Sequence, residues 1–124
     1  MTDKNLNKAT SYHMAMLNKN YDGMASYIHT NVHFIGPLAI MDGKASVVED
    51  AKNFSMFFKN LTICEKFHNE DKVMLVLEFD CPGPIGIFRE ASLLSFTDNL
   101  ISGIELFYDA RPSAKKKDEI FNQN

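Results

Sequence analysis

The sequence predicts an α+β fold in which helices lie across one face of a bent antiparallel sheet. Segments with helical spacing of apolar residues come first in the chain, and the longest segments with strand alternation follow one another toward its end. Between Val73 and Phe79 every odd-numbered position holds a large apolar residue, which is typical of a strand with a buried face. A sheet curved around helices forms a cone with an open mouth, and such a cone can hold a small molecule.

Two long amphipathic helices are predicted in the first half of the chain. Apolar residues at helical spacing indicate one helix over residues 3–20 and another over 44–59. The second helix follows Asp42-Gly43, which is expected to form a turn or an N-cap. We expect this helix to bury a stripe made of Ala45, Val48, Ala51, Phe54 and Phe58.

A short helix and a short strand are predicted between the two long helices. Asp22-Gly23 is expected to cap a helix over residues 23–29. Alternation of apolar and polar residues then predicts a strand over residues 31–35. This strand stops at Gly36-Pro37, because proline has no N–H group to donate to a neighbouring strand.

The second half of the chain is predicted to be all strand. A strand over residues 61–67 and a polar turn over 68–71 lead into a meander of three strands. The first strand of the meander ends at Cys81-Pro82-Gly83-Pro84, since two prolines cannot continue a ladder. The other two strands are expected over residues 85–96 and 100–108, joined by a tight turn at 97–99.

Length and composition limit the domain organisation and the class of partner. The 124 residues, 45% of them hydrophobic and ten of them phenylalanine, suffice for one domain with one core. We assign residues 1–112 to this domain and expect 113–124 to be a frayed tail. The net charge of −3 and the absence of a basic stripe argue against a nucleic-acid partner.

Location, metals and cofactors are predicted from the same composition. No run of apolar residues reaches the length of a membrane span, and the polar start of the chain lacks the apolar core of a signal peptide. We therefore expect a soluble, cytoplasmic protein without membrane contact, whose two cysteines stay reduced. The four histidines are scattered and lack a third ligand at suitable spacing, so neither a metal site nor a cofactor is expected.

Two short phrases and the order of the elements carry a resemblance to a known family. The phrases are YHMAMLNKNYDGM at residues 12–24 and ELFYD at residues 105–109. Over residues 6–112 the chain resembles the nuclear transport factor 2-like superfamily, especially its SnoaL-like polyketide cyclase and ketosteroid isomerase branch. The resemblance implies a cystatin-like α+β barrel, a cone-shaped curved sheet wrapped around N-terminal helices.

Of the three catalytic residues of the ketosteroid isomerases, this chain has only one at the matching position. Those enzymes use a tyrosine on the first helix, an aspartate base near the end of the first strand and a protonated aspartate on a later strand. Tyr12 stands at the tyrosine position, but Gly36 occupies the position of the base and Ser92 lies near that of the donor. A steroid isomerase with that machinery is therefore not expected, and isomerase, cyclase and hydrolase chemistry stay open.

The candidate catalytic residues are Tyr12, Glu90 and Asp109. A carboxyl group in an apolar cone has a raised pKa and can act as a general acid or base, with Glu90 the first choice and Asp109, at the rim, the second. The resemblance implies that Tyr12 donates a hydrogen bond to a carbonyl or enolate oxygen. The alternatives are a rim ion pair for Glu90 and a core role for Tyr12. The predicted ligand-binding residues are His13, Met16, Phe34, Phe54, Phe79, Phe88, Ser92, Leu106 and Tyr108.

Three functions remain open at this point. The first is an enzyme that moves a proton on a small hydrophobic carbonyl compound, as an isomerase or a cyclase. The second is a binding module for a small hydrophobic molecule, and the third is an interaction domain whose cone is filled by its own side chains. For all three we expect a homodimer through the outer sheet face, in which Glu78 or Glu105 pairs with Arg89 beside Met74, Val76, Leu93 and Ile101.

Overall fold

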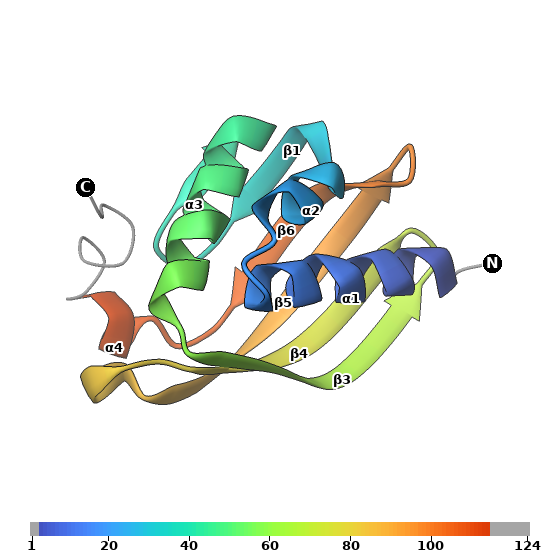
Figure 1. Cartoon of the computed structure of the whole chain (residues 1–124). Helices are drawn as coiled ribbons and strands as arrows, with labels where there is room; N and C mark the ends of the chain where they lie inside the picture. The colour runs from blue at the N-terminus through green and yellow to red at the C-terminus, as the bar shows by residue number, and fades with distance from the viewer. Residues whose placement is uncertain (1–2, 115–124) are drawn as a thin grey trace.

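The chain folds as helices packed against one curved sheet, which confirms the predicted α+β class. The computed structural model describes residues 3–114 (Figure 1). The helices are α1 (Asp3–Leu17), α2 (Tyr21–Ser26), α3 (Lys44–Phe57) and the short α4 (Arg111–Ala114), with a 3₁₀ turn η1 (Gly83–Ile85). The strands are β1 (Ile28–Ile35), β2 (Ile40–Asp42), β3 (Asn60–Asn69), β4 (Lys72–Asp80), β5 (Ile87–Thr97) and β6 (Leu100–Phe107).

The sheet has the order β2-β1-β6-β5-β4-β3, so the first long strand lies beside the last one. β1 runs parallel to β6, and all the remaining neighbouring pairs are antiparallel. The predicted three-strand meander is extended to four strands, because β3 pairs with β4 along most of its length. Figure 1 shows α1 and α3 on the same concave face of this sheet. That arrangement creates the space in which the candidate site lies.

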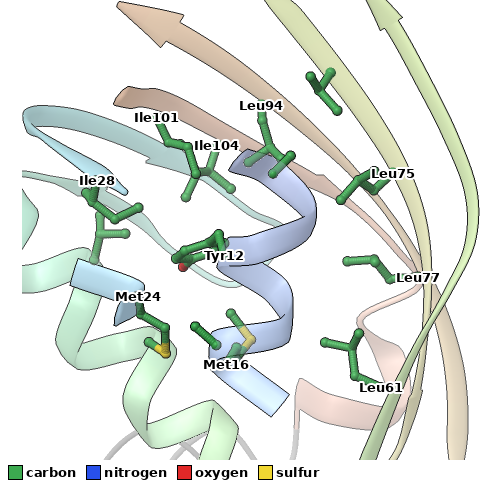
Figure 2. Close-up of a cluster of buried hydrophobic side chains, with 14 of the residues drawn as sticks. Tyr12, Met16, Met24, Ile28, Leu61, Leu75, Leu77, Leu94, Ile101 and Ile104 are labelled. Atoms are coloured by element: carbon green, nitrogen blue, oxygen red, sulfur yellow. The ribbon is translucent and has the colours of Figure 1, made fainter. Parts of the chain in front are cut away.

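The alternation predicted for the central strands is confirmed. On β4, Val73, Leu75 and Leu77 are fully buried, and Phe79 is nearly so. On the neighbouring strand β5, the buried side chains on the same face are those of Glu90, Ser92, Leu94 and Phe96. Figure 2 shows Leu75, Leu77 and Leu94 pointing from the sheet toward α1, and the Tyr12 ring on the side of this helix that is nearer to Ile104. The two polar residues on this face are therefore enclosed by an apolar core.

The short second helix begins earlier than predicted. Asn20, and not Asp22-Gly23, is its N-cap, because the Asn20 side chain accepts a hydrogen bond from the Gly23 amide at 3.1 Å. The helix ends at Ser26, and Ile28 and His29 already belong to β1. Fully buried Ile28 is held by the sheet, where it pairs with Ile101, so the tertiary contact overrides the helical pattern.

The buried face of α3 is rotated from the predicted stripe. Ala45 is exposed, whereas Val47 is almost fully buried. The helix begins directly after Gly43, whose φ of 95° suits glycine, and from there Val47, Asp50, Ala51 and Phe54 face the concave side of the sheet. Asp50 therefore lies on the inner face of the helix, although the predicted stripe did not include it.

One residue predicted for the outer sheet face lies inside. Ile101 is fully buried, because the β5–β6 pairing shifts register where Phe96 pairs with Ile101 and Ser95 with Gly103. The extra residue in β6 exchanges the two faces of the strand beyond the shift. The ion pair predicted on the outer face is present, with Arg89 Nε 3.3 Å from Glu78 Oε2.

The predicted tail lies mostly outside the described residues, which include only its first two as the end of α4. Among residues 3–114, no helix combines the length and the apolar character needed to cross a bilayer. The same residues contain no group of three or more His, Cys, Asp and Glu side chains that could hold a metal ion.

Candidate functional site

A cavity of about 130 Å³ lies between the helices and the concave face of the sheet. Every predicted site residue except Asp109 lines it, so α1, α3, β1, β4, β5 and the end of β6 all contribute a wall. Their roles remain predictions. The residues that line it are Tyr12, His13, Met16, Phe34, Gly36, Leu38, Ala39, Val47, Asp50, Ala51, Phe54, Phe79, Phe88, Glu90, Ser92, Ile104, Leu106 and Tyr108.

Asp109 does not belong to this cavity, which corrects its placement among the site residues. The strand β6 ends at Phe107, and the next residue, Tyr108, is the last one to face inward. Asp109 is exposed, and its carboxylate accepts a hydrogen bond from Arg111 at 2.7 Å. Hydrogen bonds from Arg111 lower the pKa of Asp109 to about 2, so this carboxylate holds no proton to donate near neutral pH.

The walls of the cavity are largely aromatic. The Phe54 and Phe79 rings meet edge to face with centroids 4.9 Å apart, and Phe79 stacks on Phe88 at 5.4 Å. Tyr108 extends the cluster, with its ring 5.7 Å from that of Phe88. Such walls exclude water and weaken dielectric screening, so a polar group in the cavity interacts strongly with whatever it faces.

Glu90 brings a carboxyl group into this apolar setting. It lies on β5 opposite Leu77 of β4, and only 7% of its surface is exposed. Among the described residues, no hydrogen bond or ion pair holds its carboxyl group, so the alternative of a rim ion pair is not realised. Burial raises the pKa of Glu90 to about 8. The group is therefore mainly protonated at neutral pH and can donate a hydrogen bond.

Two tyrosine hydroxyl groups lie near this carboxyl group. Burial, together with the charges of Asp50 and Glu90, raises the pKa of Tyr12 above its ordinary value. Burial likewise raises the pKa of Tyr108 to about 12, with the same two carboxylates adding to the effect. Both phenols thus keep their protons at any physiological pH, and both are hydrogen-bond donors for a ligand oxygen.

His13 contributes a neutral imidazole to the cavity. It is 3% exposed, and its Nδ1 lies 2.8 Å from the carbonyl oxygen of Ala9 one turn earlier on α1. A carbonyl oxygen can only accept, so Nδ1 carries the proton and Nε2 keeps its lone pair. Burial lowers the pKa of His13 to about 4, which keeps the ring uncharged near neutral pH.

Ser92 carries an unpaired hydroxyl group on the cavity wall. The residue is 1% exposed, and it pairs across the sheet with Leu75 and Leu106, neither of which offers a side-chain partner. In the described part of the chain, its Oγ is the one side-chain nitrogen or oxygen atom that is wholly inaccessible and has no hydrogen bond. A buried polar atom left unpaired in this way marks a place where a ligand atom can bind.

The sequence prediction missed one titratable residue of the site, Asp50. It lies on α3 and is half-buried, and burial raises its pKa to about 6. The spacing of Val47, Asp50, Ala51 and Phe54 is that of one helix face, so this signal was present in the sequence. The loop between β1 and β2 also adds Leu38 and Ala39, which follow a strand end with no recognisable pattern.

Comparisons with known proteins identify the fold and leave the reaction open. No protein-family model matches the chain, and no curated protein matches it in sequence. Several solved structures match over most of their length. A nuclear transport factor 2-like protein of unknown function from Cytophaga hutchinsonii has a TM-score of 0.76 and 18% identity, covering 85% of this chain and 89% of that one.

Two further structures bear names from the ketosteroid isomerase group. A steroid Δ-isomerase from Pseudomonas aeruginosa has a TM-score of 0.79 at 13% identity, covering 97% of this chain and 90% of that one. A protein with a ketosteroid isomerase-like fold from Catenulispora acidiphila, in complex with trimethylamine, has a TM-score of 0.69 at 15% identity, covering 82% and 85%. The chain therefore has the nuclear transport factor 2-like fold, as the resemblance implied, and identities this low carry no statement about its activity.

Proposed function

We propose that this protein is an enzyme that moves a proton on a small hydrophobic carbonyl compound, as an isomerase or a cyclase does. One observation carries the proposal: the buried carboxyl group of Glu90 faces an apolar cavity with no partner of its own. Carboxyl groups with strongly raised pKa values in a concave site are typical of general acids and bases.

The groups around Glu90 suit a carbonyl substrate. An oxygen that gains negative charge as the compound enolises can accept hydrogen bonds from the Tyr12 and Tyr108 hydroxyl groups and from protonated Glu90. These donors lie in a site with largely apolar walls, where their effect on developing charge is larger than in water. The unpaired Ser92 hydroxyl group offers one more contact for a polar substituent.

The size of the cavity indicates the size of the substrate. A cavity of about 150 Å³ in another protein holds benzene, and the cavity here measures about 130 Å³. The substrate is therefore a compound of about one small ring, well below the size of a steroid. Support for a small organic ligand also comes from the Catenulispora protein of the same fold, which was crystallised in complex with trimethylamine.

A non-catalytic binding module is the second candidate, and the aromatic walls of the cavity favour it. The third possibility, a cone filled by its own side chains, is disfavoured because a cavity remains. A homodimer through the outer sheet face is compatible with either function. There Met74 pairs with Leu93 and Ala91 with Phe107, which leaves a partly exposed apolar surface around the Glu78–Arg89 ion pair.

Hydrogen–deuterium exchange of a small cyclic ketone tests the enzyme proposal. Cyclohexanone is incubated with the protein in D₂O, and the loss of its α-proton signal is followed by NMR. The wild type should accelerate the exchange, and Glu90→Gln should slow it by about 100-fold or more, the usual contribution of a general acid or base. Glu65→Gln, which removes an exposed strand carboxyl group, is the matched control. Binding without exchange would refute the enzyme and leave the binding module.

A further inference from the structure

The cavity has a second carboxyl group, and it stands on a different wall from the first. Asp50 projects from α3, on the helix face that also presents Val47, Ala51 and Phe54 to the cavity. Glu90 projects from β5 of the sheet that this helix covers (Figure 1). A ligand in the cavity is therefore placed between a helix carboxyl group and a sheet carboxyl group.

Neither carboxyl group is committed to a structural role. Among the described residues, no hydrogen bond or ion pair to the Asp50 side chain is found, and the residues that line the cavity include no lysine and no arginine. The other titratable groups that face the cavity are the phenols of Tyr12 and Tyr108 and the imidazole of His13. None of these carries a positive charge near neutral pH, so both carboxyl groups remain available to a substrate.

We propose that Asp50 is the proton acceptor of this site and Glu90 its proton donor, acting on the same substrate from opposite walls. The inference rests on the proposed function, because it assigns the two halves of that proton transfer. It also places a required catalytic residue on α3, where none was predicted from the sequence or from the family resemblance.

The step balances with the groups present. The Asp50 carboxylate takes the proton from the carbon next to the carbonyl group, and that C–H bond breaks. Its electron pair forms the C=C bond of an enol, while the carbonyl oxygen receives the proton of Glu90. In the return step Glu90 recovers its proton from the enol oxygen, and Asp50 delivers to the same carbon, or to a conjugated one, either its proton or a deuteron for which that proton has exchanged with D₂O. No oxidant, metal or co-reactant is consumed.

The unequal burial of the two groups supports their assigned roles. Glu90 is nearly inaccessible and Asp50 is half-buried, so desolvation raises the pKa of Glu90 to about 8 and that of Asp50 only to about 6. Between these two values the prevailing state has Asp50 ionised and Glu90 protonated. Environments that push two carboxyl groups apart in this way define a base and an acid.

The test combines the cyclohexanone exchange assay with Asp50→Asn, which removes the base and keeps the shape of the side chain. Glu49→Gln, an exposed neighbour on the same helix, is the matched control. Asp50→Asn should lower the exchange rate by about 100-fold or more while the ketone still binds, as followed by chemical-shift changes, and Glu49→Gln should behave as the wild type. The wild-type rate should rise with pH to about 6 and fall above about 8.

A second measurement does not depend on activity. A ¹³C NMR titration of the side-chain carboxyl groups should find Asp50 titrating below Glu90, and both above their ordinary ranges. The reverse order, or an ordinary value for Asp50, would overturn the assignment. So would an unchanged exchange rate in Asp50→Asn, or its loss of ketone binding, although the proposed function would stand. A wild type that shows no binding or no exchange would overturn the proposed function and the assignment together.

Discussion

The stability of this protein should fall as the pH rises from about 6.5 to 8, and Glu90→Gln should abolish most of that fall. The pKa of Glu90 is about 8 in the fold and 4.5 for the free side chain. Between these values the folded state binds more protons than the unfolded state, so the free energy of unfolding decreases with rising pH. Above the folded pKa both states have lost the proton and the effect levels off.

The choice of pH window follows from the other buried groups. The pKa of His13 is lowered from 6.5 to about 4, so this residue makes stability rise with pH in that range, opposite to Glu90. Asp50, raised to about 6, acts in the same direction as Glu90 but completes its titration earlier. Above pH 6.5 the remaining contributions of His13 and Asp50 are each below about 0.5 kcal/mol and opposite in sign, so most of the slope belongs to Glu90.

The magnitude follows from the linkage relation. Each unit of pKa difference corresponds to about 1.4 kcal/mol, so titration of Glu90 should lower the free energy of unfolding by about 1.5 kcal/mol between pH 6.5 and 8. With a urea m-value of about 1.5 kcal/mol/M, the midpoint of unfolding should fall by about 1 M. The glutamine of Glu90→Gln cannot ionise. At pH 8 the free energy of unfolding of this variant should therefore exceed that of the wild type by about 4 kcal/mol, and at pH 5 the difference should be below about 1 kcal/mol.

Urea unfolding followed by circular dichroism at a series of pH values provides the measurement. Glu65→Gln should follow the wild type, because Glu65 is exposed on β3. Parallel pH profiles of the wild type and Glu90→Gln above pH 6.5 would show that the Glu90 carboxyl group is solvated in the fold. That result would refute the argument for a buried acid, and with it the main support for the proposed enzyme.

Three further predictions concern the fold and its assembly. Phe79→Ala should lower the free energy of unfolding by about 3–5 kcal/mol in a denaturant titration, since its ring packs between Phe54 and Phe88; a loss below about 1 kcal/mol would contradict this. The His13 ring should stay neutral down to about pH 4 in an NMR titration, and an ordinary value would show that the ring is solvated. Leu93→Lys should convert the proposed homodimer to a monomer in light scattering, and a monomeric wild type would contradict the interface.

The inner face of the sheet could be predicted from the sequence because strand alternation leaves only two choices of face. Leu75 and Leu77 were assigned to one face by alternation, whereas the inward placement of Glu90 and Ser92 came from the family resemblance. The structure pairs Glu90 with Leu77 and Ser92 with Leu75, which puts all four on one face. Where the alternation breaks, the same reasoning fails. Ile101 lies inside because β6 gains a residue at the register shift. The sign of this shift in the sequence is Gly103, since a glycine inside a strand pattern suggests a bulge.

The helix faces were harder to predict because an apolar stripe on a helix can be drawn in more than one phase. For α3, a stripe through Ala45 and Val48 counts five apolar residues with Ala51, Phe54 and Phe58. A stripe through Val47 counts four, and only the second includes Asp50. Tertiary packing selected the second phase. Asp109 was predicted at the rim, and it lies outside the cavity lining because the chain leaves β6 after Phe107.

The unpaired polar groups of the cavity are best understood together. A buried hydroxyl group without a partner costs the fold about 1–3 kcal/mol, and a carboxyl group more when it is ionised. The unpaired Ser92 hydroxyl group lines the same cavity as the Glu90 and Asp50 carboxyl groups, for which no protein hydrogen bond or ion pair is found among the described residues. Neutral or apolar side chains at these positions would stabilise the empty protein, so the arrangement is explained by a ligand that supplies the missing hydrogen bonds. A ligand with a carbonyl oxygen and an acidic C–H bond fits these groups, because its oxygen can accept from Ser92 and Glu90 and its C–H bond can give a proton to Asp50.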